Sequence, residues 1–145
     1  MREILFRGKR TDGQWIYGGL LKVTYDGNTY NLIFADNFLF VFGEAKAMEH
    51  ACVDPATVGQ FTGLTDKNGK KIFEGDIVRC ISMKNFPKLM TDMANMVVIF
   101  KDGEFRMVLC EKYKDYIPGC GFYVIRCFDK EVIGNIHDNP ELLEK

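Results

Sequence analysis

Apolar and polar residues alternate along much of this chain, and short turn signals separate the alternating segments. Asp-Gly dipeptides occur at Asp12-Gly13, Asp26-Gly27 and Asp102-Gly103, each between two strand-like segments. Such dipeptides favour tight hairpins, because both central residues of the turn can adopt positive φ at low cost. The pattern therefore predicts three β-hairpins.

A two-residue turn in the second hairpin places Tyr25 opposite Asn28 and points Lys22 and Asn31 to one side. The other side is then an apolar face made of four residues: Leu21, Val23, Tyr30 and Leu32.

The same register applied to the third hairpin pairs Phe100 with Phe105, and Lys101 with Glu104. In the first hairpin it sets Arg10 opposite Trp15, where the guanidinium could cover the indole ring.

The central stretch GLTDKNGKKIFEGDIV, residues 63–78, predicts two further changes of direction. Residues 66–69 suit a short loop between strands near 60–64 and 71–73, with Asn68 or Gly69 in left-handed geometry. Gly75 and Asp76 then redirect the chain into a buried strand at 77–81. Gly69, Gly75 and Asp76 are thus interpreted as structural turn residues.

Later strands are expected at 96–100, 105–110, 121–128 and 131–136, whereas helix is scarce. The segment DNPELLEK has a cap residue at Asn139 and Pro140 at the first helical position, which predicts a short terminal helix. Residues 85–96 could form another helix, and the pattern of residues 43–51 is ambiguous.

These elements predict a mainly β, barrel-like fold of hairpins and short strands with one or two short helices. Residues 1–145 form a single domain with a soft internal boundary near residue 54. It separates an N-terminal hairpin region, 1–53, from a barrel-like region, 54–145.

Composition narrows the class of protein. The chain of 145 residues is 47% apolar and 13% aromatic, which argues against disorder, and its formal charge of −1 argues against a protein that coats nucleic acid. The five widely spaced cysteines resemble buried thiols in a reducing cytoplasm more than a disulfide framework. The N-terminal residues lack the continuous apolar core of a signal peptide, and no membrane-spanning segment is expected.

Three segments resemble the YopX family of phage and prophage proteins: REILFRGKRTDGQWIYGGL, VDPATVGQFTGLTDKNGKKIFEGDIV and EVIGNIHDNPELLE. They occur in the expected order and span nearly the whole chain. The resemblance implies an all-β, barrel-like protein of the bacterial cytoplasm, in a family whose biochemical function is not established, so it transfers no catalytic residue. Residues 25–50 and 82–95 match none of its motifs.

One candidate contact surface is basic. Lys67, Lys70, Lys71 and Arg79 could contact phosphates of single-stranded nucleic acid or a partner protein. A solvated hairpin tip is the favoured interpretation, because charged turns are common. Four aromatic residues could stack on bases but are better explained as core: Trp15, Tyr17, Phe61 and Phe73.

The sequence gives weaker support for a metal or catalytic site than for the basic contact surface. The soft ligands His50 and Cys52, and the trio Cys120, Cys127 and His137, lack the paired spacing of zinc sites, so no metal or cofactor is predicted. Asp54, Glu74 and Asp76 lie beside turns, where carboxylates cap the backbone, and no nucleophile with its base is recognisable.

Methionines are concentrated in one segment. Met90, Met93 and Met96 would lie along one side of a short helix, either as an adaptable protein interface or as a lid over the barrel.

We therefore expect a non-enzymatic phage accessory protein, a binding module that acts through an unknown protein partner or as a homo-oligomer. A nucleic-acid-binding module that uses the basic corner is the first alternative, and a small hydrolase is the second. Salt-dependent binding of single strands would favour the first, whereas ionisable side chains clustered in a deep pocket would favour the second.

Overall fold

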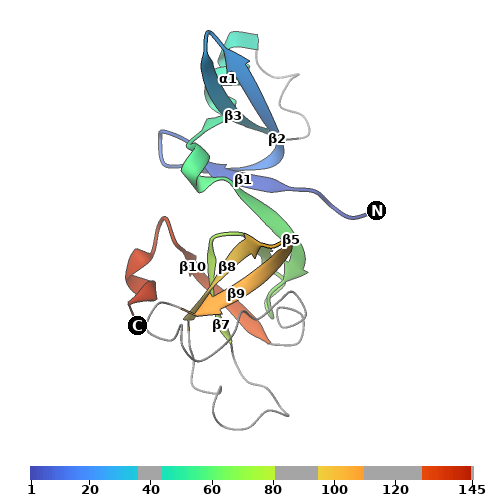
Figure 1. The fold of residues 1–145 in the computed structure, drawn as a ribbon, viewed down its shortest axis with the longest axis vertical. Coiled ribbons are helices and arrows are strands. Elements are labelled where there is room, and N and C mark those ends of the chain that lie inside the picture. Colours follow the sequence, from blue (N-terminus) through green and yellow to red (C-terminus); the bar gives the residue numbers. More distant parts are fainter. Residues whose placement is uncertain (36–43, 81–94, 110–128, 145) are drawn as a thin grey trace. The chain divides into compact units, whose positions relative to one another are not determined.

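A computed structural model describes residues 1–35, 44–80, 95–109 and 129–144 of the chain (Figure 1). The chain divides into two compact units, Met1–Phe61 and Thr62–Lys145. The strand predicted at 121–128 and most of the helix predicted at 85–96 lie outside the described residues. In the part that the structure describes, no helix is long and apolar enough to cross a membrane.

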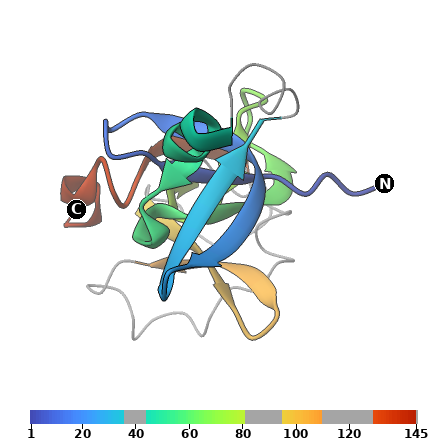
Figure 2. The same ribbon diagram turned by 90° about the horizontal axis from the view of Figure 1, so that it is seen from above.

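The first unit is built on an antiparallel sheet. It contains β1 (Phe6–Lys9), β2 (Trp15–Tyr25), β3 (Asn28–Phe34) and β4 (Cys52–Val53), hydrogen-bonded in the order β4-β3-β2-β1. The segment with ambiguous periodicity forms α1 (Glu44–Ala51), which lies against β3 (Figure 2). A 3₁₀ turn, η2 (Pro55–Thr57), then leads into β5 (Gly59–Thr65), which pairs with β1.

The register predicted for the second hairpin is confirmed. Leu21 lies opposite Leu32, Val23 opposite Tyr30 and Tyr25 opposite Asn28. Both turn residues have positive φ, 49° at Asp26 and 75° at Gly27, as a tight two-residue turn requires. Burial differs within each face: on the apolar face Leu32 is buried whereas Leu21 and Tyr30 are exposed, and Asn31 is buried on the other face.

The register predicted for the first hairpin is wrong by one residue. Trp15 lies opposite Lys9, and the Arg10 amide donates to the Gln14 carbonyl oxygen, so the loop has three residues. Only Gly13 in this loop has positive φ, 84°, which suits a three-residue hairpin loop and not a two-residue turn.

As a result, the guanidinium group over the indole ring belongs to Arg7 and not to Arg10. The Arg7 guanidinium carbon lies 4.9 Å from the centre of the Trp15 ring. Arg10 is instead paired with the carboxylate of Asp12, at 2.8 Å, and donates to Nδ1 of His50, at 3.2 Å.

The second unit contains the remaining strands and the central turns. The end of β5 lies beside β6 (Lys71–Phe73). A four-stranded antiparallel sheet follows in the order β10-β7-β8-β9, with β7 (Asp76–Cys80), β8 (Asn95–Lys101), β9 (Glu104–Leu109) and β10 (Lys130–Asn135). Its core consists of seven buried side chains: Ile72, Val78, Met96, Val98, Phe105, Met107 and Val132.

The third hairpin joins β8 and β9 as predicted. Phe100 lies opposite Phe105 and Lys101 opposite Glu104, with φ of 53° at Asp102 and 83° at Gly103. The two aromatic rings meet edge to face, with 5.1 Å between their centres.

The terminal helix is a single 3₁₀ turn, η5 (Pro140–Leu143), and not an α-helix. Asn139 occupies the cap position without capping the turn, because its side-chain oxygen accepts from the Asn135 amide instead, at 3.3 Å. The fold is therefore mainly β, as expected. The strand orders of the described residues do not close on themselves, so a barrel stays a prediction.

Candidate functional site

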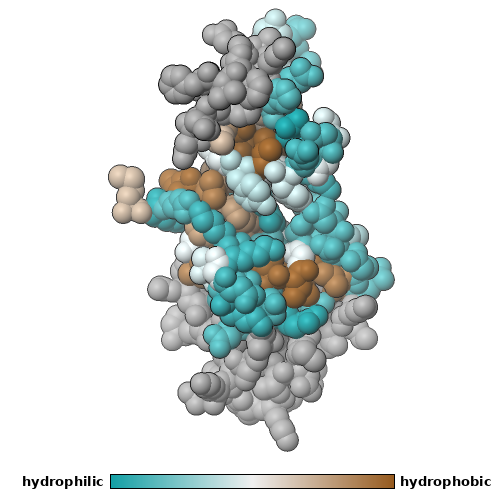
Figure 3. Space-filling view, turned by 180° about the vertical axis from the view of Figure 1, so that it is seen from behind, coloured by the Kyte–Doolittle hydropathy of each residue, from teal (hydrophilic) through white to brown (hydrophobic). Residues whose placement is uncertain are grey.

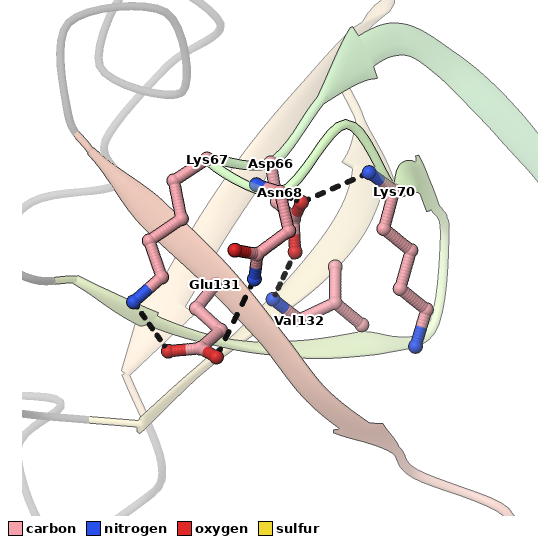
Figure 4. Close-up of polar contacts among 6 residues, drawn as sticks. All are labelled: Asp66, Lys67, Asn68, Lys70, Glu131 and Val132. Carbon is pink, nitrogen blue, oxygen red and sulfur yellow. Dashed lines mark hydrogen bonds and ion pairs between the residues drawn. The ribbon is translucent and has the colours of Figure 1, made fainter.

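The central loop is held by the carboxylate of Asp66, which is only 7% exposed. One oxygen, Oδ1, accepts hydrogen bonds from the amides of Asn68, at 2.8 Å, and Lys70, at 2.9 Å. The other oxygen, Oδ2, accepts from the amide of Val132 in β10, at 3.0 Å (Figure 4). One side chain therefore shapes the loop and joins it to a strand far away in the sequence.

Two opposing effects act on the acidity of Asp66. Burial by itself raises the pKa of the carboxyl group, because the charged form loses its hydration. The amides of Val132, Lys70 and Asn68 stabilise the charged form, and the resulting pKa is lower than the ordinary value of 3.8. Asp66 therefore acts as a charged acceptor of backbone amides and is unsuited to giving up or taking a proton near neutral pH.

A second set of contacts joins the same loop to β10. The ammonium group of Lys67 lies 2.9 Å from the carboxylate of Glu131, and the Lys67 amide donates to the Lys130 carbonyl oxygen, also at 2.9 Å. The hydrogen bond from Lys67 lowers the pKa of Glu131. The side chain of Asn68 also reaches Glu131, at 3.5 Å (Figure 4).

The next turn has the same construction. Gly75 has a φ of 83°, and its amide donates to the carbonyl oxygen of Val98, at 2.8 Å. The buried carboxylate of Asp76 accepts from the amide of Phe73, at 2.8 Å. The carbonyl oxygen of Gly75 accepts from the amide of Ile136, at 2.9 Å. The two aspartates of the central stretch are thus both engaged with the backbone.

The predicted basic residues do not gather into one patch. Lys67 is paired with Glu131, whereas the side chain of Lys70 leaves the loop in a different direction (Figure 4). Lys71 is exposed at the start of β6. Arg79 lies in β7 at the position paired with Glu131 of β10, and its Nε atom is buried without a hydrogen-bond partner among the described residues. The carboxylate of Glu131 therefore offsets part of the positive charge of Lys67.

The methionine and aromatic candidates are mostly part of the core or lie outside the described residues. Met96 is buried in β8 within the core, so it does not extend an exposed helical stripe, and Met90 and Met93 lie outside the described residues. Phe61 and Phe73 are buried, Trp15 is half-buried beneath Arg7, and Tyr17 is exposed. Within the described ranges, no group of three or more His, Cys, Asp or Glu side chains is placed to hold a metal ion.

Sequence reasoning missed an exposed apolar surface on the second hairpin. We call it the hairpin stripe and define it as five residues of one face of β2 and β3: Tyr17, Leu21, Val23, Tyr25 and Tyr30. Leu21 is 50% exposed, Tyr25 72%, Tyr17 46% and Tyr30 36%. The alternation identified most of this face, but the same alternation is expected whether a face is covered by the protein or left for a partner.

Exposed apolar side chains occur elsewhere too. Figure 3 shows brown patches among hydrophilic residues on the face that it presents. Exposed examples outside the stripe are Met1, Ile4, Met48 and Phe100. Single apolar residues at the surface are normal, whereas several on one strand pair form a candidate contact surface.

These features define the class as a small, mainly β protein whose central turns are held by buried carboxylates. The family model described as YopX protein matches residues 5–144, nearly the whole chain. The chain therefore belongs to the YopX protein family, as its three segments predicted. No curated protein sequence matches it.

A solved structure gives a further comparison. The chain is similar to the crystal structure of protein EF1440 from Enterococcus faecalis, with 25% sequence identity and a TM-score of 0.51. The match covers 99% of each chain, so the likeness extends over both units.

Proposed function

We propose that this chain is a non-catalytic accessory protein of a phage or prophage, which works in the bacterial cytoplasm by binding a protein partner or another copy of itself. Membership of the YopX family supports the phage setting, because the family is one of phage and prophage proteins. The hairpin stripe is the observation that carries the binding role.

The stripe supports a protein contact because of its chemistry. Tyr and Leu side chains provide a large apolar contact area, and Tyr also offers a hydroxyl group for hydrogen bonding. Tyr25 and Leu21 are at least half exposed at the surface, so a partner would remove them from water at little cost in polar desolvation.

The carboxylates of the central turns support a non-catalytic role. Asp66 and Asp76 are buried, and both accept backbone amides at hydrogen-bonding distances. A general base must reach a substrate proton, and a nucleophile needs an activating partner. These two side chains are instead used to hold turns, which leaves the hydrolase alternative without support from them.

The nucleic-acid alternative is also weakened. Contact with phosphates relies on cations that are not already neutralised. Lys67 is already paired with Glu131, at 2.9 Å. Lys70 and Lys71 are exposed, but two adjacent lysines in a protein of net charge −1 are a weak attraction for a nucleic acid.

The test is recovery of the protein with its partners from phage-infected or lysogenic cells. We expect the parent protein to retain a partner protein or a differently tagged copy of itself, and the variant Tyr25→Thr to lose it at equal yield. Lys22→Ser, on the opposite face of the same strand, is the matched control and should retain the partner. Salt-sensitive binding of single-stranded DNA or RNA that is lost in the double variant Lys70→Glu, Lys71→Glu would overturn the proposal.

A further inference from the structure

We propose that the hairpin stripe is a self-association surface, on which a second copy of this chain docks face to face to form a weak, reversible dimer. This inference rests on the proposed function, because it names the partner of the stripe. Four observations carry it: the contrast between the two faces of the hairpin, the absence of charge on the stripe, its area and its self-complementarity.

The hairpin is exposed on both faces near its turn, and the two faces differ in chemistry: the stripe face has one polar side chain there, Asn28, whereas the opposite face is wholly polar. Lys22, Thr24 and Thr29 lie on the face opposite the stripe, and the hydroxyl groups of the two threonines are 3.3 Å apart. Tyr25 and Tyr30 lie on the stripe and are exposed over the same part of the hairpin. A hairpin that needed only to be solvated would have no reason to carry large apolar groups on one side, so the stripe is suited to being covered.

The scarcity of charged side chains on the hairpin restricts the kind of partner that the stripe can bind. Residues 15–34, which form the whole hairpin, contain one cation, Lys22, and one carboxylate, Asp26. Lys22 lies on the opposite face, and Asp26 lies in the turn. The stripe itself therefore has no charged side chain, and the cation paired with Tyr17 at its end, Arg7 of β1, is only 5% exposed. A second copy meets no like charge when its stripe faces this one.

The exposed area indicates the strength of the contact. Fully exposed aromatic side chains present about 150 to 250 Å² each, so the exposed fractions of the stripe give about 400 Å² for each copy. Stable interfaces bury about 800 Å² for each partner. The stripe alone is thus large enough for a weak contact and too small for a permanent one, which is why we infer a reversible dimer.

Symmetry makes a second copy the simplest occupant. A two-fold axis brings identical surfaces together and closes the assembly at two copies. Leu21 lies between Tyr17 and Tyr25 on β2, at the middle of the stripe, so an axis near it sets the two Leu21 side chains against each other. Two β-sheet faces then stack with interdigitating side chains, as in a β-sandwich.

The test uses sedimentation equilibrium on the purified full chain over roughly a hundred-fold range of concentration. We expect the average mass of the parent protein to rise towards that of a dimer as the concentration increases. Leu21→Glu and Leu21→Lys should each weaken self-association by at least about tenfold, because each brings like charges together at the axis. An equimolar mixture of the two variants should recover association at low salt, because Glu then faces Lys.

The controls separate self-association from misfolding and from another partner. Lys22→Glu, on the opposite face, should associate as the parent does, and circular dichroism with thermal melting verifies the fold of each variant. If the Leu21 variants do not fold, Tyr25→Thr replaces them and should also reduce the average mass.

Three results would overturn the inference. They are a parent protein that stays monomeric at every concentration, a Leu21→Glu variant that associates like the parent, and a mixture of the two Leu21 variants that stays monomeric. If self-association fails while a cellular protein is still captured through Tyr25, the proposed function stands and only the identity of the partner is wrong. Failure of both experiments would remove both proposals.

Discussion

Asp66 organises the central loop at the scale of a single residue. Its carboxylate satisfies the amides of Asn68 and Lys70 within the loop and the amide of Val132 in β10. Buried amides without partners are costly, so removal of this acceptor affects the loop and the strand together. The side chain is thus a structural connection between residues that are 66 positions apart.

Replacement of Asp66 by Asn should lower the free energy of unfolding by about 1 to 3 kcal/mol. The amide keeps one accepting oxygen, so it cannot serve the loop amides and the Val132 amide as the carboxylate does. Urea denaturation at neutral pH measures the loss. Asp129→Asn, at an exposed position just before β10, is the control and should change the stability little. Equal stability of both variants and the parent would contradict this role of Asp66.

The stability should also depend on pH through Asp66. Its pKa in the folded protein lies below 3.8, so the charged carboxylate favours folding at pH values above 3.8. That contribution decreases below 3.8 and is lost as the pH falls through the lower, folded-state pKa. The difference in unfolding free energy between the parent protein and Asp66→Asn should therefore shrink in this acidic range. A difference that stayed constant, or grew on acidification, would argue against a charged Asp66.

Glycine is required at position 69 because of its backbone angle and not because a side chain would clash there. Its φ is 80°, yet a Cβ atom at this position would meet no heavy atom within 4 Å. Gly69→Ala should therefore cost about 1 to 2 kcal/mol through backbone strain alone. Gly69→Asn should cost less, because Asn tolerates left-handed geometry. Thermal melting of both variants checks the order, and an alanine variant as stable as the asparagine variant would count against it.

At the scale of elements, two adjacent glycines in β2 show how tightly the first sheet is assembled. A Cβ atom on Gly18 would meet the backbone carbonyl oxygen of Phe34, whereas a Cβ atom on Gly19 would meet nothing within 4 Å. Backbone atoms cannot move aside as a flexible side chain can. Gly18 therefore allows β2 to come close to the end of β3.

Alanine at these two positions gives a matched pair of variants. Gly18→Ala should destabilise the protein by about 2 to 3 kcal/mol, because the strands must separate to accept the methyl group. Gly19→Ala should change stability by less than about 0.5 kcal/mol. Chemical denaturation of the two variants measures the contrast, and similar values for both would show that Phe34 is not held against β2 as described.

At the scale of the whole molecule, charge reversal in the central loop distinguishes the protein-binding function from the nucleic-acid-binding alternative. Reversal of Lys67, Lys70 and Lys71 to Glu should lower stability by less than about 1 kcal/mol, since exposed ion pairs contribute little. The loss should come from Lys67, which would then repel Glu131, and from Lys70, whose positive charge helps to stabilise the ionised Asp66 carboxylate. Neither form should bind single-stranded DNA or RNA in a gel-shift assay at low salt. Tight binding by the parent protein that the reversal abolishes would favour the nucleic-acid function.

The hairpins were predictable because their information is local. Asp-Gly at 26–27 and 102–103 prefers the backbone angles that a two-residue turn needs, and the alternation on either side then determines the pairing. The first hairpin was misjudged for the same local reason: Asp12-Gly13 is also compatible with a three-residue loop. That difference of one residue moved Lys9, and not Arg10, opposite Trp15.

The candidate site depended more on distant contacts. The sequence by itself determined that residues 66–69 turn, with left-handed geometry at Asn68 or Gly69, and that Leu21, Val23 and Tyr30 share a face; the structure places that geometry at Gly69. Only the tertiary structure decided that Asp66 reaches Val132 and that Lys67 is neutralised by Glu131. It also decided that Leu21 stays exposed while Leu32 is buried on the same face. Neighbouring residues determine the local backbone preference, so it can be predicted from the sequence. Burial and ion pairing depend on which distant segments pack against a residue, and the alternation of apolar and polar residues does not reveal which segments those are.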